Sequence, residues 1–252
     1  MLAGITVSDY LKSVLDLMIP RVCLVCGEKL SLEEDHICRG CLADLPRTYY
    51  SIMPRNRMAD RLNALIQKDL DGLSNPVYVP YANAAALFFY RASTGYRNIT
   101  KSLKYRGNIP AGRYFARMLA EEMRSSSLYG DVDLVVPVPL HWTRRWARGY
   151  NQSEIIGRVL ADAFGADFGG DVLVRMRKTR TQTHLSLLEK TVNVAGAFAV
   201  RDKGRLNGFR HILLVDDVFT TGSTVHACYS ELRKIISPEV KVSVATLACV
   251  GD

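Results

Sequence analysis

One segment near the C-terminus constrains the fold more than any other part of the sequence. It runs His211-Ile-Leu-Leu-Val-Asp-Asp-Val-Phe-Thr-Thr-Gly-Ser-Thr-Val225. The apolar run at 212–215 is typical of a strand that is buried on both faces of a parallel sheet, and it predicts a strand over residues 211–216. Asp216 and Asp217 are then expected where that strand ends, at the sheet edge where open α/β folds bind their ligands.

The residues that follow the two carboxylates predict an anion site. Thr220, Thr221, Gly222, Ser223 and Thr224 bring hydroxyls and backbone N–H groups to the start of an expected helix over 222–236. The N-terminus of a helix attracts phosphate, and Gly222 lets the backbone bend close to it. Because carboxylates accept hydrogen bonds from vicinal hydroxyls, the segment suits a phosphorylated sugar.

Three other interpretations compete for this segment. A nucleotide hydrolase also places carboxylates after an apolar strand, but it requires a G-x-x-x-x-G-K-[ST] loop, which the sequence lacks. A receiver domain carries its acidic pair early in the domain, whereas here the pair comes last. A helix capped by Ser or Thr, without a ligand, is the third interpretation. It leaves the two adjacent carboxylates unexplained.

Four of the six cysteines lie within 19 residues, at Cys23, Cys26, Cys38 and Cys41. Two Cys-x2-Cys pairs at this distance are typical of a closed tetrahedral zinc site, which is structural because a catalytic zinc keeps an open position. His36 replacing one thiolate is one alternative. Disulfide bonds are the other, disfavoured because no secretion signal is evident.

The rest of the chain predicts an α/β fold with a mostly parallel sheet and helices on both faces, plus a small N-terminal four-cysteine zinc-ribbon module. Expected divisions are an amphipathic helix at 1–20, the zinc ribbon at 21–45, a connector at 46–83 and the main domain at 84–252. Strands are expected at 84–90, 133–138, 171–175, 211–216 and 240–250, and helices at 58–70, 110–126, 151–164, 182–192 and 222–236. With 48% hydrophobic residues and no membrane span, the chain is expected in the cytoplasm.

The net charge of +8, from 33 Lys and Arg against 25 Asp and Glu, favours an anionic ligand. The loop after the strand at 133–138 is expected at the same sheet edge as the carboxylates. It carries Arg144, Arg145, Arg148, Asn151 and Gln152, and clustered guanidinium groups suit a polyanion. A solvated basic loop without a ligand is the alternative.

The segment from His211 resembles the phosphoribosyl pyrophosphate (PRPP) signature of type I phosphoribosyltransferases. Further motifs, together with the cysteines, make the chain similar to the ComF family of competence-associated proteins over nearly its whole length. They are Val136-Pro-Val-Pro-Leu-His141, Arg148-Gly-Tyr-Asn-Gln152, Thr179 with Gln182, and Asn193 with Gly196-Ala-Phe198. The usual family pattern has Arg where this chain has Lys190.

This resemblance implies that Asp216 and Asp217 are catalytic and bind PRPP together with residues 220–224. It also implies that the arginine loop holds the pyrophosphate, and that a mobile loop with Arg175, Arg177, Arg180 and Gln182 covers the substrate. Mg²⁺ would arrive with PRPP and zinc would be structural. The implied reaction is displacement of pyrophosphate from the ribose anomeric carbon by an acceptor that the sequence leaves open, and the implied role is DNA uptake during natural transformation, with DNA-uptake proteins as partners.

The alternative function is a non-enzymatic protein that handles single-stranded DNA and uses the phosphosugar pocket for binding or regulation. Basic residues alternate with aromatic ones along one stretch, and such a pattern can follow a DNA backbone and stack on bases. Packing of an amphipathic helix explains the stretch equally well. Its residues are Tyr90, Arg91, Tyr96, Arg97, Lys101, Lys104, Tyr105 and Arg106.

Overall fold

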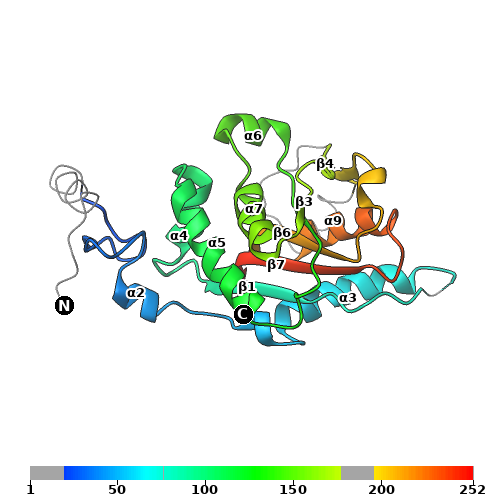
Figure 1. The fold of residues 1–252 in the computed structure, drawn as a ribbon, viewed down its shortest axis with the longest axis horizontal. Helices are drawn as coiled ribbons and strands as arrows, with labels where there is room; N and C mark the ends of the chain where they lie inside the picture. Colours follow the sequence, from blue (N-terminus) through cyan, green and yellow to red (C-terminus); the bar gives the residue numbers. More distant parts are fainter. Residues whose placement is uncertain (1–19, 76, 177–195, 252) are drawn as a thin grey trace.

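The computed structural model describes residues 20–75, 77–176 and 196–251, and its centre is a five-stranded sheet (Figure 1). The strand order is β1-β7-β6-β2-β3, and each of these neighbouring pairs is parallel. The strands are β1 (Ala84–Tyr90), β2 (Leu134–Pro137), β3 (Asp167–Phe168), β6 (His211–Phe219) and β7 (Lys241–Val250). The α/β class with a mostly parallel sheet is therefore confirmed.

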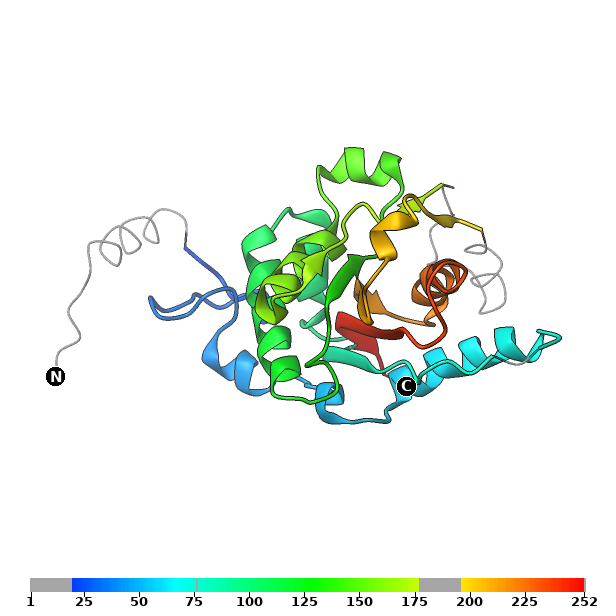
Figure 2. The same ribbon diagram turned by 45° about the vertical axis from the view of Figure 1, so that its right-hand side comes forward.

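Helices cover both faces of this sheet, as expected (Figure 2). One layer contains α4 (Arg97–Tyr105), α5 (Ile109–Arg124) and α7 (Gln152–Phe164), and the other contains α3 (Arg57–Asp71) and α9 (Ser223–Arg233). Alternate side chains of β6 pack against the two layers, because successive residues of a strand point to opposite faces of the sheet. Leu213 and Val215 pack with α5 and α7, and Ile212 and Leu214 pack with α3 and α9.

The remaining elements are short. They are α2 (Arg39–Ala43), η1 (Tyr50–Ile52), α6 (Trp142–Arg148), β4 (Leu173–Arg175), β5 (Phe198–Val200) and η3 (Gly204–Leu206). Among the helices of the described residues, none has the length and the apolar character that crossing a lipid bilayer demands. The helices expected at 1–20 and 182–192 lie outside the described residues.

The segment at 46–83 packs closely against the main sheet. Thr48 N–H donates to the Leu87 carbonyl at 3.2 Å, and Phe89 N–H donates to the Pro46 carbonyl at 2.8 Å, so this segment runs along the outer edge of β1. In α3, Met58, Leu62 and Ile66 are buried in the core with α9. The segment therefore supplies one of the helices of the α3–α9 layer.

The strand expected at 171–175 was placed wrongly. Leu173–Arg175 forms β4, which pairs antiparallel with β5 in a separate two-stranded sheet, and β3, which was not expected, takes the edge of the main sheet. The cause is the glycine pair that follows β3. A Cβ on Gly169 would lie 2.8 Å from the Val172 side chain, and one on Gly170 would lie 2.6 Å from the Phe168 ring, so the chain turns tightly there.

Two further differences lie at the ligand edge of the sheet. Strand β6 continues to Phe219, which pairs with Cys249 of β7, so the carboxylates lie within the strand and not beyond its end. The expected arginine loop contains helix α6. It begins after His141, whose Nδ1 accepts from Thr143 N–H at 3.3 Å, and it ends at Gly149 with a φ of 78°.

Candidate functional site

The two adjacent carboxylates of β6 are held by groups from two different helices. Asp216 Oδ1 accepts a hydrogen bond from Ser153 Oγ of α7 at 3.0 Å and one from the Asp217 backbone N–H at 2.8 Å. Asp217 Oδ2 lies 2.8 Å from Lys104 Nζ of α4, and the side chain of Asp217 is almost entirely buried. The site therefore has two carboxylates and one ammonium group, which leaves an excess of negative charge when both acids are ionised.

Burial and mutual repulsion perturb the ionisation of this group. Burial, followed by the charge of Asp217, raises the pKa of Asp216 to about 7, against the opposing charge of Lys104. Burial alone would lower the pKa of Lys104, but the charges of Asp217 and Asp216 outweigh it and raise that pKa. Asp216 can therefore gain or lose a proton near neutral pH while Lys104 stays charged.

The loop of residues 220–224, which we call the hydroxyl loop, follows β6 and opens α9 as predicted. Gly222 has a φ of 81°, a left-handed conformation that favours glycine, and α9 begins at Ser223. The hydroxyls of Thr221 and Ser223 lie 2.9 Å apart. Arg61 of α3 donates to the Thr220 carbonyl at 3.0 Å. The loop thus brings hydroxyls and a helix N-terminus to the strand end that carries the carboxylates.

The predicted arginine loop divides into residues that shape the site and residues that face outward. Asn151 and Gln152 are buried; Asn151 Nδ2 donates to the Val138 carbonyl at 3.0 Å, and its Oδ1 accepts from Ser153 N–H. Arg148 donates to Gln152 Oε1 at 3.0 Å, while Arg145 forms an ion pair with Glu154 at 2.7 Å. Asn151 therefore positions the start of α7, including the Ser153 that contacts Asp216.

One residue of the predicted mobile loop, Arg175, lies close to α6. Arg175 lines the same pocket as Trp142 and Arg145 of α6, and burial, followed by the positive charge of Arg144, lowers the pKa of Arg175. Asp216 acts on Arg175 in the opposite direction. Arg177, Arg180 and Gln182 lie outside the described residues, as do Thr179, Lys190 and Asn193.

Lys104, Ser153 and Arg61 were missed as site residues. Lys104 appears in the sequence as one of several cations in a basic stretch, and Ser153 as an ordinary first-turn residue of a helix. No local sequence pattern around Lys104 or Ser153 indicates that either residue contacts the carboxylates. Their roles arise because α4 and α7 cross the same end of β6 from one face of the sheet, whereas Arg61 reaches the hydroxyl loop from the other face.

The four cysteines of the predicted zinc site come together. Their sulfur atoms all lie within 4.8 Å of one another, and Cys26 Sγ and Cys38 Sγ are 3.8 Å apart. A tetrahedral zinc with Zn–S bonds of about 2.3 Å has sulfur–sulfur edges of roughly 3.8 Å, so the cluster fits this ion. The cysteines are free of disulfides, and the ring of His36 packs edge-on against Tyr114 outside the cluster.

Backbone N–H groups donate hydrogen bonds to two of these sulfurs, and such bonds favour the thiolate form that binds a metal. Cys23 Sγ accepts from the N–H groups of Val25 and Cys38, and Cys38 Sγ accepts from Cys41 N–H, each at 3.4 Å. Burial opposes ionisation of Cys23, but the hydrogen bonds outweigh it and lower its pKa to about 7. A thiolate at neutral pH is the form that binds zinc.

The cysteine module (residues 21–45) is docked on the main body. Tyr96 Oη donates to the Cys41 carbonyl at 3.0 Å, and Leu30, Ile37 and Leu45 belong to the core that contains α5. At Gly95 the two backbones are so close that a Cβ would lie 2.2 Å from the Val25 carbonyl oxygen. The module therefore contacts α4 and α5 and lies away from the hydroxyl loop (Figure 1).

Curated relatives are similar to this chain in sequence, although no family model matches it. Competence protein F of Haemophilus influenzae is 30% identical over 57% of this chain and 64% of that protein. DNA utilization protein YhgH of Salmonella typhimurium is 30% identical over 83% of this chain and 89% of that protein. Competence protein ComFC of Streptococcus pneumoniae is 25% identical over 87% of this chain and 96% of that protein. Identity at this level over nearly the full length of YhgH shows that the chain belongs to the ComF family.

Proposed function

We propose that the protein binds PRPP at the carboxyl end of β6 and serves in the uptake or use of DNA. The observation that carries the PRPP proposal is the pairing of Asp216 and Asp217 with the hydroxyl loop at the start of α9. Carboxylates and a phosphate-binding turn on consecutive residues match the two ends of a ribose 5-phosphate. The relatives named for competence and DNA utilization support the cellular role.

Each part of the site has a role in this proposal. The hydroxyl loop would hold the 5-phosphate through its N–H groups and hydroxyls, and the carboxylates would accept hydrogen bonds from the ribose hydroxyls. Arg144, Arg148 and Arg175 would face the pyrophosphate, because guanidinium groups donate to phosphate in pairs. Mg²⁺ would be held mainly by phosphate oxygens, with Asp216 or Asp217 as its nearest protein carboxylate.

Such a site supports phosphoribosyl transfer without a covalent nucleophile on the protein. In that reaction the bond from the anomeric carbon to pyrophosphate breaks and a bond to the acceptor forms. The charges that surround the leaving group would stabilise its developing negative charge. Lys104 would hold the Asp217 side chain in place, so that its carboxylate is already positioned for the ribose hydroxyls before the reaction begins.

Isothermal titration calorimetry with Mg²⁺ and PRPP tests the proposal. The double substitution Asp216→Asn and Asp217→Asn should weaken binding more than about tenfold, because charge-assisted hydrogen bonds to the ribose hydroxyls are lost. Asp167→Asn, which alters an exposed carboxylate on β3, is the matched control and should leave affinity unchanged. Equal affinity of the double variant and the control would refute the assignment.

A second function, binding of single-stranded DNA, is favoured by the surface of α6. Trp142 and Trp146 are 70% and 88% exposed and lie four residues apart on this helix, among Arg144, Arg145 and Arg148. Exposed aromatic rings interspersed with arginines are typical of surfaces that stack bases and follow a phosphate backbone. Tyr105, which is 72% exposed, lies beside them under the guanidinium of Arg148.

The basic stretch from Tyr90 to Arg106 is a weaker candidate for this surface. Tyr96 is engaged with the cysteine module, and Lys104 is committed to Asp217. A substitution of Lys104 therefore disturbs the carboxylate site and cannot report on a separate DNA surface. We place the DNA proposal on α6 for this reason.

Tryptophan fluorescence offers a direct test, because Trp142 and Trp146 are the only two tryptophans in the chain. An oligothymidylate should quench this emission, and Trp142→Ala with Trp146→Ala should weaken binding, measured by anisotropy of the labelled DNA, about tenfold. Tyr78→Ala, at an equally exposed ring, is the control. Unquenched emission on saturation with DNA would exclude α6 as the contact surface.

A further inference from the structure

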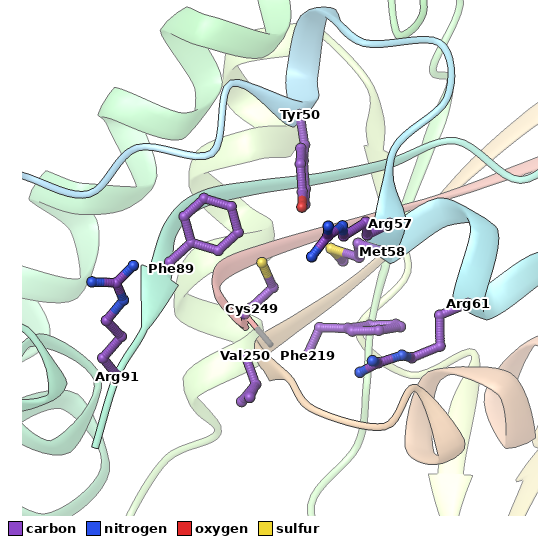
Figure 3. A pocket seen from close by; sticks show the side chains of 10 residues that line it. Tyr50, Arg57, Met58, Arg61, Phe89, Arg91, Phe219, Cys249 and Val250 are labelled. Carbon is purple, nitrogen blue, oxygen red and sulfur yellow. The ribbon is translucent and has the colours of Figure 1, made fainter. Parts of the chain in front are cut away.

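A cavity of about 190 Å³ lies at the carboxyl ends of β1, β6 and β7, beside the hydroxyl loop (Figure 3). Neither Asp216 nor Asp217 lines it, so it is distinct from the carboxylate site. It is lined by Tyr50, Arg57, Met58, Arg61, Phe89, Arg91, Phe219, Cys249, Val250 and Gly251. The inner walls and the rim differ sharply in chemistry.

The inner walls are apolar. Met58, Phe219 and Cys249 are 2–3% exposed, and the rings of Tyr50 and Phe89 meet edge to face with centroids 5.6 Å apart. Burial raises the pKa of Cys249 to about 12, so its thiol is neutral at physiological pH and adds no charge. These walls favour a flat hydrocarbon or aromatic group over water.

The rim is cationic. Arg57, Arg61 and Arg91 line the cavity, and no Asp or Glu is among its lining residues. Figure 3 shows Arg57 and Arg91 on opposite sides of Phe89, with the Arg57 guanidinium and the Tyr50 hydroxyl directed toward the same space. A ligand with a negative charge at the rim would meet guanidinium donors from two elements of the fold.

The cavity is also joined to the hydroxyl loop. Arg61, at the rim, donates to the Thr220 carbonyl. Phe219, in the wall, lies against Gly222, where a Cβ would be 2.7 Å from the Phe219 ring. A ligand in the cavity would therefore contact Arg61 and Phe219, two side chains that also contact the hydroxyl loop.

We propose that this cavity binds a small organic acid, with one aromatic ring between the apolar walls and its carboxylate at the arginine rim. An apolar cavity of about 150 Å³ accommodates benzene, so a single ring fits the available volume. The apolar walls favour this class over inorganic phosphate, and the arginines favour it over a neutral ring.

The probes are benzoate and its neutral analogue benzamide, with binding measured by ligand-observed NMR on the full zinc-loaded chain. Benzoate should bind at least about fivefold more tightly than benzamide or inorganic phosphate. The substitution of Arg57 and Arg61 by Gln should weaken benzoate binding about tenfold, as expected when charged hydrogen bonds are lost. Arg55→Gln with Lys68→Gln, at exposed positions on or just before α3, is the control and should bind normally.

Arg91→Gln is an independent arm, since it leaves α3 and the Thr220 contact intact, and it should also weaken benzoate binding. The protein with Asp216 and Asp217 replaced by Asn should still bind benzoate, which separates this cavity from the PRPP site. Benzamide or phosphate binding as tightly as benzoate would overturn the proposal. So would unchanged benzoate affinity in both arginine variants.

Discussion

Replacing Asp216 by Asn should stabilise the protein while it weakens PRPP binding. The pKa of Asp216 is raised from 3.8 to about 7, so the folded protein binds a proton there more tightly than the unfolded chain does. Ionisation of Asp216 therefore costs folding free energy as pH rises from about 4 to 7, and the full cost persists above pH 7. An Asn at this position never ionises and avoids that cost.

The pKa shift of Asp216 sets the size of the expected stabilisation by Asp216→Asn. At about 1.36 kcal/mol per pKa unit, the change from 3.8 to about 7 is worth at most about 4 kcal/mol, and about 2 kcal/mol of it develops between pH 5.5 and 7. The surface of Asp216 is only partly buried, so solvent screens part of this interaction and we expect about half of these values. Asn also retains an oxygen that can accept from Ser153 Oγ and the Asp217 N–H.

Urea denaturation at pH 5.5, 7 and 8.5, with zinc saturating throughout, measures this difference. The advantage of Asp216→Asn over the wild type should grow by about 1 kcal/mol from pH 5.5 to 7 and then stay constant. Comparison of the two proteins at each pH cancels the titration of all other groups, and Asp167→Asn controls for a change of net charge. Parallel stability profiles of wild type and Asp216→Asn across this range would refute the raised pKa and the reasoning built on it.

Other changes test the remaining parts of the structure. Cys23→Ser should lower the zinc content of the purified protein from one equivalent to nearly none by elemental analysis, while PRPP binding persists; a full equivalent in the variant would exclude the four-cysteine site. Gly95→Ala should push the cysteine module off α4, because its Cβ would lie 2.2 Å from the Val25 carbonyl oxygen, and faster proteolysis within residues 21–45 would report it. Gly222→Ala should cost about 1 kcal/mol for its positive φ, with a further cost from the Phe219 ring, and weaken PRPP binding severalfold; wild-type affinity would place the phosphate elsewhere. Lys104→Met leaves the carboxylates without their cation, and should shift the pH at which PRPP binding is half-maximal upward, as measured by calorimetry between pH 6 and 9.

Much of the sheet and of the candidate site was predictable because its signals are local. A strand that is buried on both faces needs apolar side chains at consecutive positions. The run at 212–215 shows this pattern directly in the sequence. The spacing of the two Cys-x2-Cys pairs likewise encodes a turn geometry that brings four sulfurs together. The turn at Gly222 and the helix start at Ser223 depend on backbone preferences of the residues themselves.

Other features were not predicted, two because their local signals are weak and one because it depends on pairing with a distant strand. The glycine pair after Phe168 directed the next strand away from the main sheet, although residues 173–175 have a strand-like sequence in either place. Helix α6 formed in a segment that composition marks only as basic, since His141 and Gly149 supply its two ends. Strand β6 continued beyond the carboxylates because β7 pairs with it as far as Cys249.

The sequence by itself determined the parallel α/β core, the cysteine cluster and the position of the hydroxyl loop beside two carboxylates, because each follows from neighbouring residues. Only the tertiary structure decided that Lys104 and Ser153 meet those carboxylates at sequence separations of 113 and 63 residues respectively. It also decided that Arg57, Arg61 and Arg91 surround one apolar cavity. Such groups come together when helices pack on a sheet, and the free energy of that packing comes from apolar side chains elsewhere in the elements. The fold as a whole therefore determines which groups contact a buried charge, and no local sequence pattern indicates them.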